Sequence, residues 1–345
     1  LVSFLINELF PIFRSITGIG IVRTIQILGK YIPLKLTKFK SGLKVNDWTV
    51  PLEWIIKSAY IITPEKKKIC DIKKNNLHIV NYSIPVNKYV NKKELDKHLH
   101  SLPHVPNAIP YVTSYYEKQW GFCISHNERK KLNSGRYKVV IESNFKKGIL
   151  PVVESVIKGK SKKEIVFTSY ICHPSMANDQ LSGPITLLLL YQRLIKIKKP
   201  RFSYRFIFMP ETIGSLCYLS KNYKNLKRDI IAGYTVSLTG GSGPIVYRKA
   251  RDESSLTNIV IARVLKNKKS ISENFNPSKG NDQRQFCSPG YNLPIGSLTN
   301  TQPNKTMEYH TSMDNIKNVK KENIIKIVDI CVQVVKEFES LEIYK

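Results

Sequence analysis

Residue types that bind divalent metal ions occur in three short polar segments of the chain. The segments are CHPSMANDQLSGP, PETIGS and EYHTSMDN, and their candidate ligands are His173, Asp179, Glu211, His310 and Asp314. Imidazole nitrogens and carboxylate oxygens form a ligand set that suits Zn²⁺ or another divalent metal. Such a site permits metal-assisted hydrolysis, in which the metal acidifies a water molecule and polarises a carbonyl group while a carboxylate accepts the proton.

Each of these residues also has a simpler explanation. A single histidine in a loop is more often a surface residue than a metal ligand. Asp179 or Glu211 could cap the helix that follows it. The prediction of a metal site therefore depends on whether the fold brings the residues together.

Strands and helices alternate after residue 150. The apolar pattern predicts strands over residues 164–171, 204–209, 230–238 and 294–298 and helices over residues 184–197, 215–223, 256–265 and 321–338. This alternation is typical of an α/β fold with a mostly parallel sheet and helices on both faces. Ligands bind such sheets beyond the carboxyl ends of the strands, so the polar segments that follow the strands should share one edge.

The part of the chain before residue 150 has a different pattern of predicted helices and strands. Helical periodicity within residues 3–29 predicts two short helices. From about 53 to 147 the sequence contains short β-rich runs, over residues 60–62, 78–82, 111–115 and 137–141, and one helical piece over residues 93–100. Turns containing Pro and Asn separate these runs, which indicates a separate, mostly β unit.

Composition excludes several classes of protein. The 345 residues are 42% hydrophobic and 10% aromatic, which is enough to build a core and argues against disorder. Apolar stretches fall far short of the roughly 20 residues that span a bilayer, so we expect no membrane span. The six cysteines show no CxxC pair, which fits reduced thiols and a cytoplasmic location. A homo-oligomer is compatible with the sequence.

The formal charge of +29 suggests a nucleic-acid partner at first sight. However, the chain has 43 Lys and only 12 Arg, and the lysines are scattered over its whole length. Recognition of phosphates or bases would favour clustered Arg with interleaved aromatic residues. The densest basic run, KGKSKK at residues 158–163, lies where a turn between two strands is expected. We therefore ascribe the basic pI of about 9.8 to background composition and do not expect nucleic-acid binding.

Long motifs in the chain resemble a known family. They run from residue 9 to 315 and are LFPIFRSITG, DWTVPLEW, NNLHIVNYSIPV, IPYVTSYYEKQWGFCIS, ICHPSMANDQLSGP, FMPETIGSLCYLS and GNDQRQFCSPGYNLPIGSL. They are similar to bacterial proteins of unknown function with an aminopeptidase-like domain, often named polysaccharide biosynthesis proteins and related to zinc aminopeptidases. The resemblance implies a zinc-exopeptidase-like α/β domain over residues 1–52 and 148–345, interrupted by a nested β-rich domain over residues 53–147. Family members usually continue into a C-terminal winged helix, which we expect to be absent because the chain stops at Lys345.

The resemblance also implies roles for individual residues. His173 matches the first metal ligand, Asp179 the carboxylate that bridges two metals, and His310 the late ligand. The family pattern has two adjacent glutamates, a general base and a ligand, whereas here Pro210 precedes a single Glu211. A further acidic ligand is expected where this chain has Gly240 and Gly241 in SLTGGSGP. We therefore expect one tightly bound zinc, with a second weak or missing, and Glu211 as either base or ligand.

Two further segments offer candidates for substrate contacts. Asp282, Gln283 and Arg284 lie in the loop segment GNDQRQF, where Asp282 could equally cap the following turn. The aromatic residues of TSYYEKQWGF could form one wall of the substrate pocket from the β-rich unit, although aromatic residues in such units more often belong to the core: Tyr115, Tyr116 and Trp120.

Two classes of function remain open at this stage. The first is a zinc hydrolase that cleaves an amide, either at a peptide N-terminus or on an amino sugar, with a role in surface polysaccharide biosynthesis suggested by the family's naming. The second is an inactive metal-binding module that binds saccharide, peptide or nucleic acid. The missing acidic ligand favours the second, whereas the intact set of His173, Asp179, Glu211 and His310 favours the first.

Overall fold

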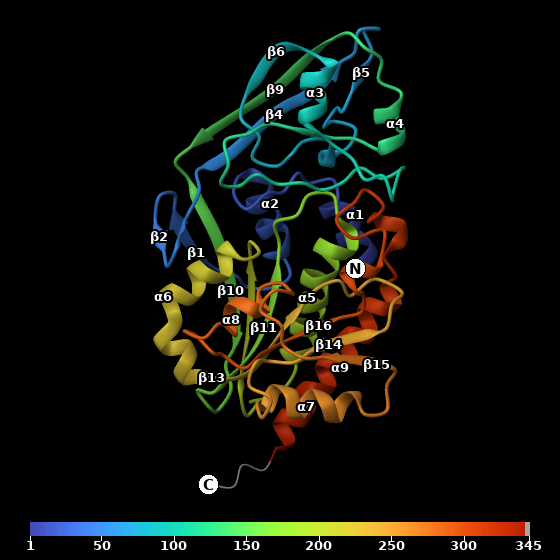
Figure 1. The fold of residues 1–345 in the computed structure, drawn as a ribbon. Coiled ribbons are helices and arrows are strands. Elements are labelled where there is room, and N and C mark those ends of the chain that lie inside the picture. Colours follow the sequence, from blue (N-terminus) through green and yellow to red (C-terminus); the bar gives the residue numbers. More distant parts are fainter. Residues whose placement is uncertain (342–345) are drawn as a thin grey trace.

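An eight-stranded mixed sheet forms the centre of the molecule. The computed structural model describes residues 1–341, and Figure 1 shows this sheet in the lower part of the view. Its strand order is β1-β10-β12-β11-β13-β16-β14-β15. The strands are β1 (Lys35–Lys40), β10 (Ile149–Ile157), β11 (Glu164–Tyr170), β12 (Ser203–Met209), β13 (Ile230–Val236), β14 (Ile245–Arg248), β15 (Ser270–Glu273) and β16 (Ile295–Thr299).

The four central strands are parallel, and antiparallel pairing occurs only toward the edges. Strands β12, β11, β13 and β16 pair in parallel, whereas β10 and β14 run antiparallel to their central neighbours. Every residue of β11, with the sequence EIVFTSY, is buried. A central strand covered on both faces is expected to be rich in apolar residues, and the run Ile165–Phe167 made this strand recognisable in the sequence.

Helices cover both faces of this sheet, as predicted. Phe167 and Phe206 pack into one apolar cluster with α1, α2, α5, α7 and α9, while Val166 and Ile207 face a second cluster with α6 and α8. Successive residues of a strand point to opposite faces, so the alternation separates the two clusters. The helices are α1 (Val2–Leu9), α2 (Ile19–Leu28), α5 (Gly183–Leu194), α6 (Ile213–Asp229), α7 (Leu256–Leu265), α8 (Gln283–Phe286) and α9 (Lys321–Ser340).

A second, four-stranded antiparallel sheet lies above the first in Figure 1. Its order is β5-β4-β9-β6, and its longest strands form the pair β4·β9. The elements of this region are β4 (Glu53–Ile62), β5 (Lys68–Ile69), β6 (Val86–Asn91), α3 (Lys92–Lys97), β7 (Leu99–His100), β8 (Phe122–Cys123), α4 (His126–Lys130) and β9 (Arg136–Lys146). A small hairpin, β2 (Lys44–Val45) and β3 (Trp48–Thr49), precedes it. The nested unit over residues 53–147 stays a proposal, and apolar residues of this region, such as Trp54, share a cluster with Val166 and Ile207 of the main sheet.

Two strands predicted in this region do not form. Residues 78–82 follow a short 3-10 helix, Asn76–His78, and residues 111–115 form an irregular loop. Both segments take part only in isolated bridges, such as Asn81 with Thr113. The loop of residues 109–111 instead contacts the other part of the chain, because Ile109 N–H donates to Ser312 Oγ at 2.9 Å and Tyr111 N–H donates to the His310 carbonyl at 2.8 Å.

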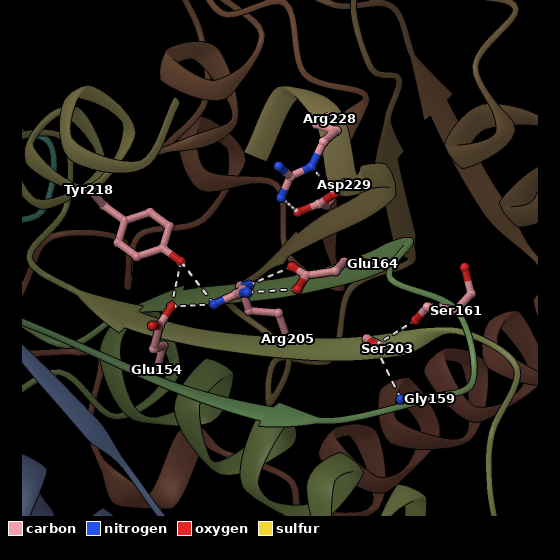
Figure 2. A network of polar contacts seen from close by, with 9 residues as sticks. All are labelled: Glu154, Gly159, Ser161, Glu164, Ser203, Arg205, Tyr218, Arg228 and Asp229. Atoms are coloured by element: carbon pink, nitrogen blue, oxygen red, sulfur yellow. Dashed lines mark hydrogen bonds and ion pairs between the residues drawn. The ribbon is translucent and has the colours of Figure 1, made fainter. Parts of the chain in front are cut away.

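A partly buried ionic network lies at the opposite end of the main sheet. Figure 2 shows Arg205, on β12, between Glu164 of β11 and Glu154 of β10. Arg205 contacts both oxygens of Glu164 at 2.6 and 2.7 Å and Glu154 at 2.6 Å, and Tyr218 of α6 donates to Glu154 at 2.5 Å. The network therefore joins three strands and one helix away from the candidate metal ligands.

Among residues 1–341, no helix combines the length and the apolar character needed to cross a bilayer. All six cysteines are free and buried.

Candidate metal centre

Two of the predicted ligands follow neighbouring parallel strands. His173 follows β11 and Glu211 follows β12, whose last residues, Tyr170 and Met209, lie side by side in the register. The parallel pairing brings both side chains to one edge of the sheet, where His173 Nε2 lies 3.6 Å from Glu211 Oε2. The His173 side chain is almost fully buried, and its backbone N–H donates to Gln180 Oε1 at 2.6 Å.

Asp179 lies on a π-helical turn, Ala177–Ser182, that leads into α5. Asp314 fixes this turn, because its carboxylate accepts hydrogen bonds from the backbone N–H groups of Ala177, Asn178 and Asp179. Turns of this kind are rare and often occur at functional sites. The carboxylate of Asp314 is thus used by the backbone, and its role here is to position Asp179.

His310 reaches Asp179 from the loop that precedes α9. Its Nε2 lies 3.1 Å from Asp179 Oδ2, and its backbone has a positive φ of 54°. The ring packs edge-on against Tyr111 and stacks on Tyr309. A strained backbone is kept only where the surroundings enforce it, so these aromatic contacts hold His310 toward the carboxylate.

His173, Asp179 and His310 form a group that could hold one metal ion. Each offers one ligand atom, and these atoms lie within 4.8 Å of one another. Burial lowers the pKa of His173 to about 4, so its imidazole is neutral near pH 7. Burial alone would raise the pKa of Asp179, but His310, His173 and Tyr170 outweigh it and lower that pKa to about 2. Neutral imidazole and ionised carboxylate are the protonation states that bind metals.

The surroundings of Asp179 Oδ2 test whether these three residues suit a metal ion. The atom is buried and accepts no hydrogen bond from residues 1–341, although His310 Nε2 is close to it. An ionised oxygen that is buried without a hydrogen-bond donor carries a large desolvation cost. A cation between this oxygen and the neighbouring imidazole nitrogens would offset that cost in place of the direct contact with His310, so the residues fit a metal ion.

Glu211 is presented by a strained turn. Thr212 has φ 64° and ψ −72°, and Ile213 N–H donates to the Glu211 carbonyl at 2.8 Å, which makes a γ-turn at the end of β12. Asp282 holds this turn, because its Oδ1 accepts from Thr212 N–H at 2.7 Å. Burial raises the pKa of Glu211 well above its usual range, and Asp282 and Asp179 raise it further.

The positions where the family resemblance implies further acidic ligands do not offer them. Pro210 precedes Glu211 and Thr212 follows it, so neither neighbour of Glu211 is acidic, and Thr212 N–H donates to Asp282 Oδ1. Gly240 N–H donates to Asn178 Oδ1, and a Cβ on Gly240 would lie 2.6 Å from a Val319 methyl group. The backbone is packed too closely there for a larger side chain.

The predicted substrate residues are placed in different surroundings. Tyr115, Tyr116 and Arg284 line a cavity of about 740 Å³ together with His173, Glu211 and His310. Three others do not line it. Trp120 stacks on His98 in the nested region, Gln283 donates to the carbonyls of Arg248 and Lys249, and Asp282 binds Thr212 N–H. We therefore correct their assignment: they pack inside the protein or position other residues.

Several residues at the site were missed in the sequence. Arg14 is fully buried, and its Nε donates to the His173 carbonyl at 2.8 Å. Tyr170 donates a hydrogen bond to Asp179 Oδ1. Trp48 and Tyr111 line the same cavity as Tyr115. Only Arg14 carried a signal, because an arginine in the mostly apolar segment LFPIFRSITG is unusual.

Known proteins resemble this chain over nearly its whole length. A Clostridium acetobutylicum protein, provisionally named a polysaccharide biosynthesis protein with an aminopeptidase-like domain, is 41% identical over 342 residues, covering 99% of this chain and 78% of that protein. A crystal structure from the same organism, provisionally named a peptidase, superposes with a TM-score of 0.94 at 40% identity and covers 98% of this chain and 80% of the other.

A more distant structure shares the fold. BSAP, a zinc aminopeptidase from Bacillus subtilis, has a TM-score of 0.71 at 13% identity, covering 98% of this chain and 94% of that one. A family model described as "Domain of unknown function (DUF4910)" matches residues 4–340. The chain therefore belongs to this DUF4910 family, and its fold is that of the zinc aminopeptidases.

Proposed function

We propose that this chain is a metal-dependent amide hydrolase whose metal ion is held by His173, Asp179 and His310. The observation that carries the proposal is the convergence of three buried or half-buried ligand atoms within 4.8 Å of one another. Oδ2 of Asp179, which is buried, accepts no hydrogen bond within residues 1–341 and lies 3.1 Å from His310 Nε2, supports the same conclusion. Two histidines and one carboxylate with an open position are typical of catalytic zinc sites.

We propose zinc as the metal and one ion per chain. Zinc bound there would act as a Lewis acid that acidifies water and polarises an amide carbonyl. A second ion lacks anchors, because Pro210 precedes a single Glu211, and Gly240 and Gly241 stand where a further acidic ligand would be needed. Asp179 Oδ1, which a bridging carboxylate would use, already accepts a hydrogen bond from Tyr170.

Glu211 is the proposed proton acceptor. Its carboxylate borders the ligand group, 3.6 Å from His173 Nε2, and its side chain is 28% exposed toward the cavity. A raised pKa brings a carboxylate closer to the pH at which it can exchange protons with substrate. The γ-turn at Thr212 and the contact from Asp282 fix the direction in which Glu211 points.

The substrate is proposed to be an amide, either at a peptide N-terminus or on an amino sugar, and the polysaccharide role suggested by the relative's name belongs to the same proposal. Six free cysteines support a cytoplasmic location.

The complete ligand group and the raised pKa of Glu211 do not favour the inactive binding module, because such a module has no need of a proton acceptor.

The test is the replacement of Glu211 by Gln in zinc-loaded protein. Aminoacyl p-nitroanilides and N-acetylated amino sugars serve as substrates, and zinc content is measured in parallel. Turnover should fall about 10²- to 10⁴-fold with zinc retained. Glu117→Gln is the matched control, since Glu117 lines the same cavity outside the ligand group, and it should keep most activity. Wild-type turnover by Glu211→Gln would contradict the assignment of Glu211.

A further inference from the structure

A second cavity lies on the other side of Glu211. Its volume is about 590 Å³, and among residues 1–341 Glu211 alone lines both this cavity and the one bordered by His173 and His310. We call the second cavity the polar chamber. An amide that reacts at Glu211 therefore has room to extend one of its two halves into the polar chamber.

The charges on the wall of the polar chamber are unbalanced. Arg248, Lys279 and Lys305 are cationic, whereas the carboxylates are Glu211 and Glu273. Glu273 is already neutralised by Arg248, at 2.7 Å. Neither lysine forms an ion pair with any residue from 1 to 341. The chamber thus carries a net positive charge close to the reacting position.

The guanidinium of Arg248 has hydrogen-bond donors that no residue from 1 to 341 uses. Only Nη2 is used for the Glu273 carboxylate, and neither Nη1 nor Nε forms a hydrogen bond within the described part of the chain. The side chain is 16% exposed, so its guanidinium is fixed in the wall and still reaches the cavity. A planar guanidinium with free N–H groups suits a carboxylate or phosphate group.

The rest of the wall consists largely of hydroxyl and amide side chains, such as Asn274 and Gln302. These groups can donate and accept hydrogen bonds, as sugar hydroxyls require, although some of them, such as Gln302, also bond within the protein. A charged, hydroxyl-bearing ligand therefore matches this chamber better than an aliphatic side chain does.

We propose that the polar chamber binds an anionic, hydroxyl-bearing half of the substrate, such as a sugar that carries a phosphate or carboxylate group. The inference deepens the proposed function, on which it rests for placing the reacting amide at Glu211. It names the class of substrate on one side of that amide. The anion would lie among Arg248, Lys279 and Lys305, and the hydroxyl groups would contact the amide side chains.

Binding of small probes tests this proposal. Glucose 6-phosphate, glucuronate and neutral glucose are titrated into the purified protein by calorimetry at fixed ionic strength. At least one of the two anionic sugars should bind about tenfold or more tightly than glucose, since a charge-assisted hydrogen bond contributes about 1.5–3 kcal/mol. The preferred anionic sugar distinguishes a phosphate from a carboxylate. Equal binding of all three sugars would overturn the proposal.

Variants locate the binding. Lys279→Gln together with Lys305→Gln should weaken the preferred anionic sugar about tenfold or more. Lys158→Gln with Lys160→Gln removes the same charge from a cleft at the opposite end of the sheet and should change little. Equal losses in both double variants would show that the net charge of the protein attracts the probe, which would also overturn the proposal.

Arg248 is tested with its partner. Arg248→Gln combined with Glu273→Gln avoids an unpaired carboxylate and should weaken the same probe, with the unfolding transition measured alongside. These titrations require neither zinc nor turnover. If the proposed metal centre is wrong, the preference for anionic sugars can still be observed. If the proposed role of the polar chamber is wrong, zinc binding can still be observed.

Discussion

The hydroxyl group of Tyr170 donates a hydrogen bond to Oδ1 of Asp179, which leaves Oδ2 as the oxygen that faces His310. Tyr170 is the last residue of β11 and is buried, so the direction of its hydroxyl group is set by the sheet. The contact orients the carboxylate and occupies one acceptor site of Oδ1. We propose that Asp179 thereby offers Oδ2 as its ligand atom to a single metal ion.

Tyr170→Phe should weaken zinc binding while the stoichiometry stays the same. Loss of a hydrogen bond to a metal-binding carboxylate costs about 10- to 100-fold in metal affinity. Competition with a fluorescent chelator measures the zinc Kd. Tyr234→Phe is the matched control, because it removes an equally buried hydroxyl group that donates to the Thr257 carbonyl. An unchanged zinc Kd in Tyr170→Phe would argue that this hydrogen bond does not orient Asp179 for the metal.

Asp282→Asn should shift the pH dependence of activity. Burial and then Asp282 raise the pKa of Glu211, and Glu211 must be ionised to accept a proton. Activity therefore falls as the pH drops through this pKa, and removing the Asp282 charge moves the fall to lower pH. Asn keeps an oxygen that can accept from Thr212 N–H. The measurement is kcat against pH, with Asp252→Asn as an exposed control. If the decrease in kcat at low pH occurs at the same pH in Asp282→Asn, or at a higher pH, Asp282 does not raise the pKa of Glu211.

Arg205→Met should destabilise the fold. The side chains of Arg205, Glu154 and Glu164 are 11–18% exposed, so the substitution leaves two partly buried carboxylates without their cation. Breaking a buried ion pair costs about 3–5 kcal/mol, which urea unfolding can measure. Arg193→Met, which breaks an exposed pair with Asp329, should cost less than about 1 kcal/mol. Similar losses in both variants would show that the network in Figure 2 contributes little.

Much of the main sheet could be predicted from the sequence because its pattern is strong. The helix expected over residues 256–265 forms over Leu256–Leu265, and the buried strand expected over residues 164–171 ends one residue earlier, at Tyr170. Strands β14 and β15, at one end of the sheet, were missed because four residues are too few to show a periodic pattern. Residues 78–82 and 111–115 looked like strands because they contain Ile, Val and Tyr, yet they form only isolated bridges.

The site was predictable only where strand ends fix positions. His173 and Glu211 follow parallel neighbours, so their proximity could be inferred from the alternating pattern. Tyr170 and Arg14 act through hydrogen bonds between residues far apart in sequence or across a turn, which no spacing encodes. Gln283 had the composition of a substrate contact, but its amide is used by backbone carbonyls that only the folded loop brings near.

Zinc titration of the wild type beside His310→Ala tests the central claim most directly. The measurement is zinc bound per chain, by calorimetry and by metal analysis after dialysis, with His126→Ala as a control because His126 lies outside the ligand group. We predict about one tightly bound zinc in the wild type and in the control, and its loss in His310→Ala, because removing one of three ligands opens the coordination shell. Equal zinc in all three proteins, or none in the wild type, would contradict a metal centre at His173, Asp179 and His310.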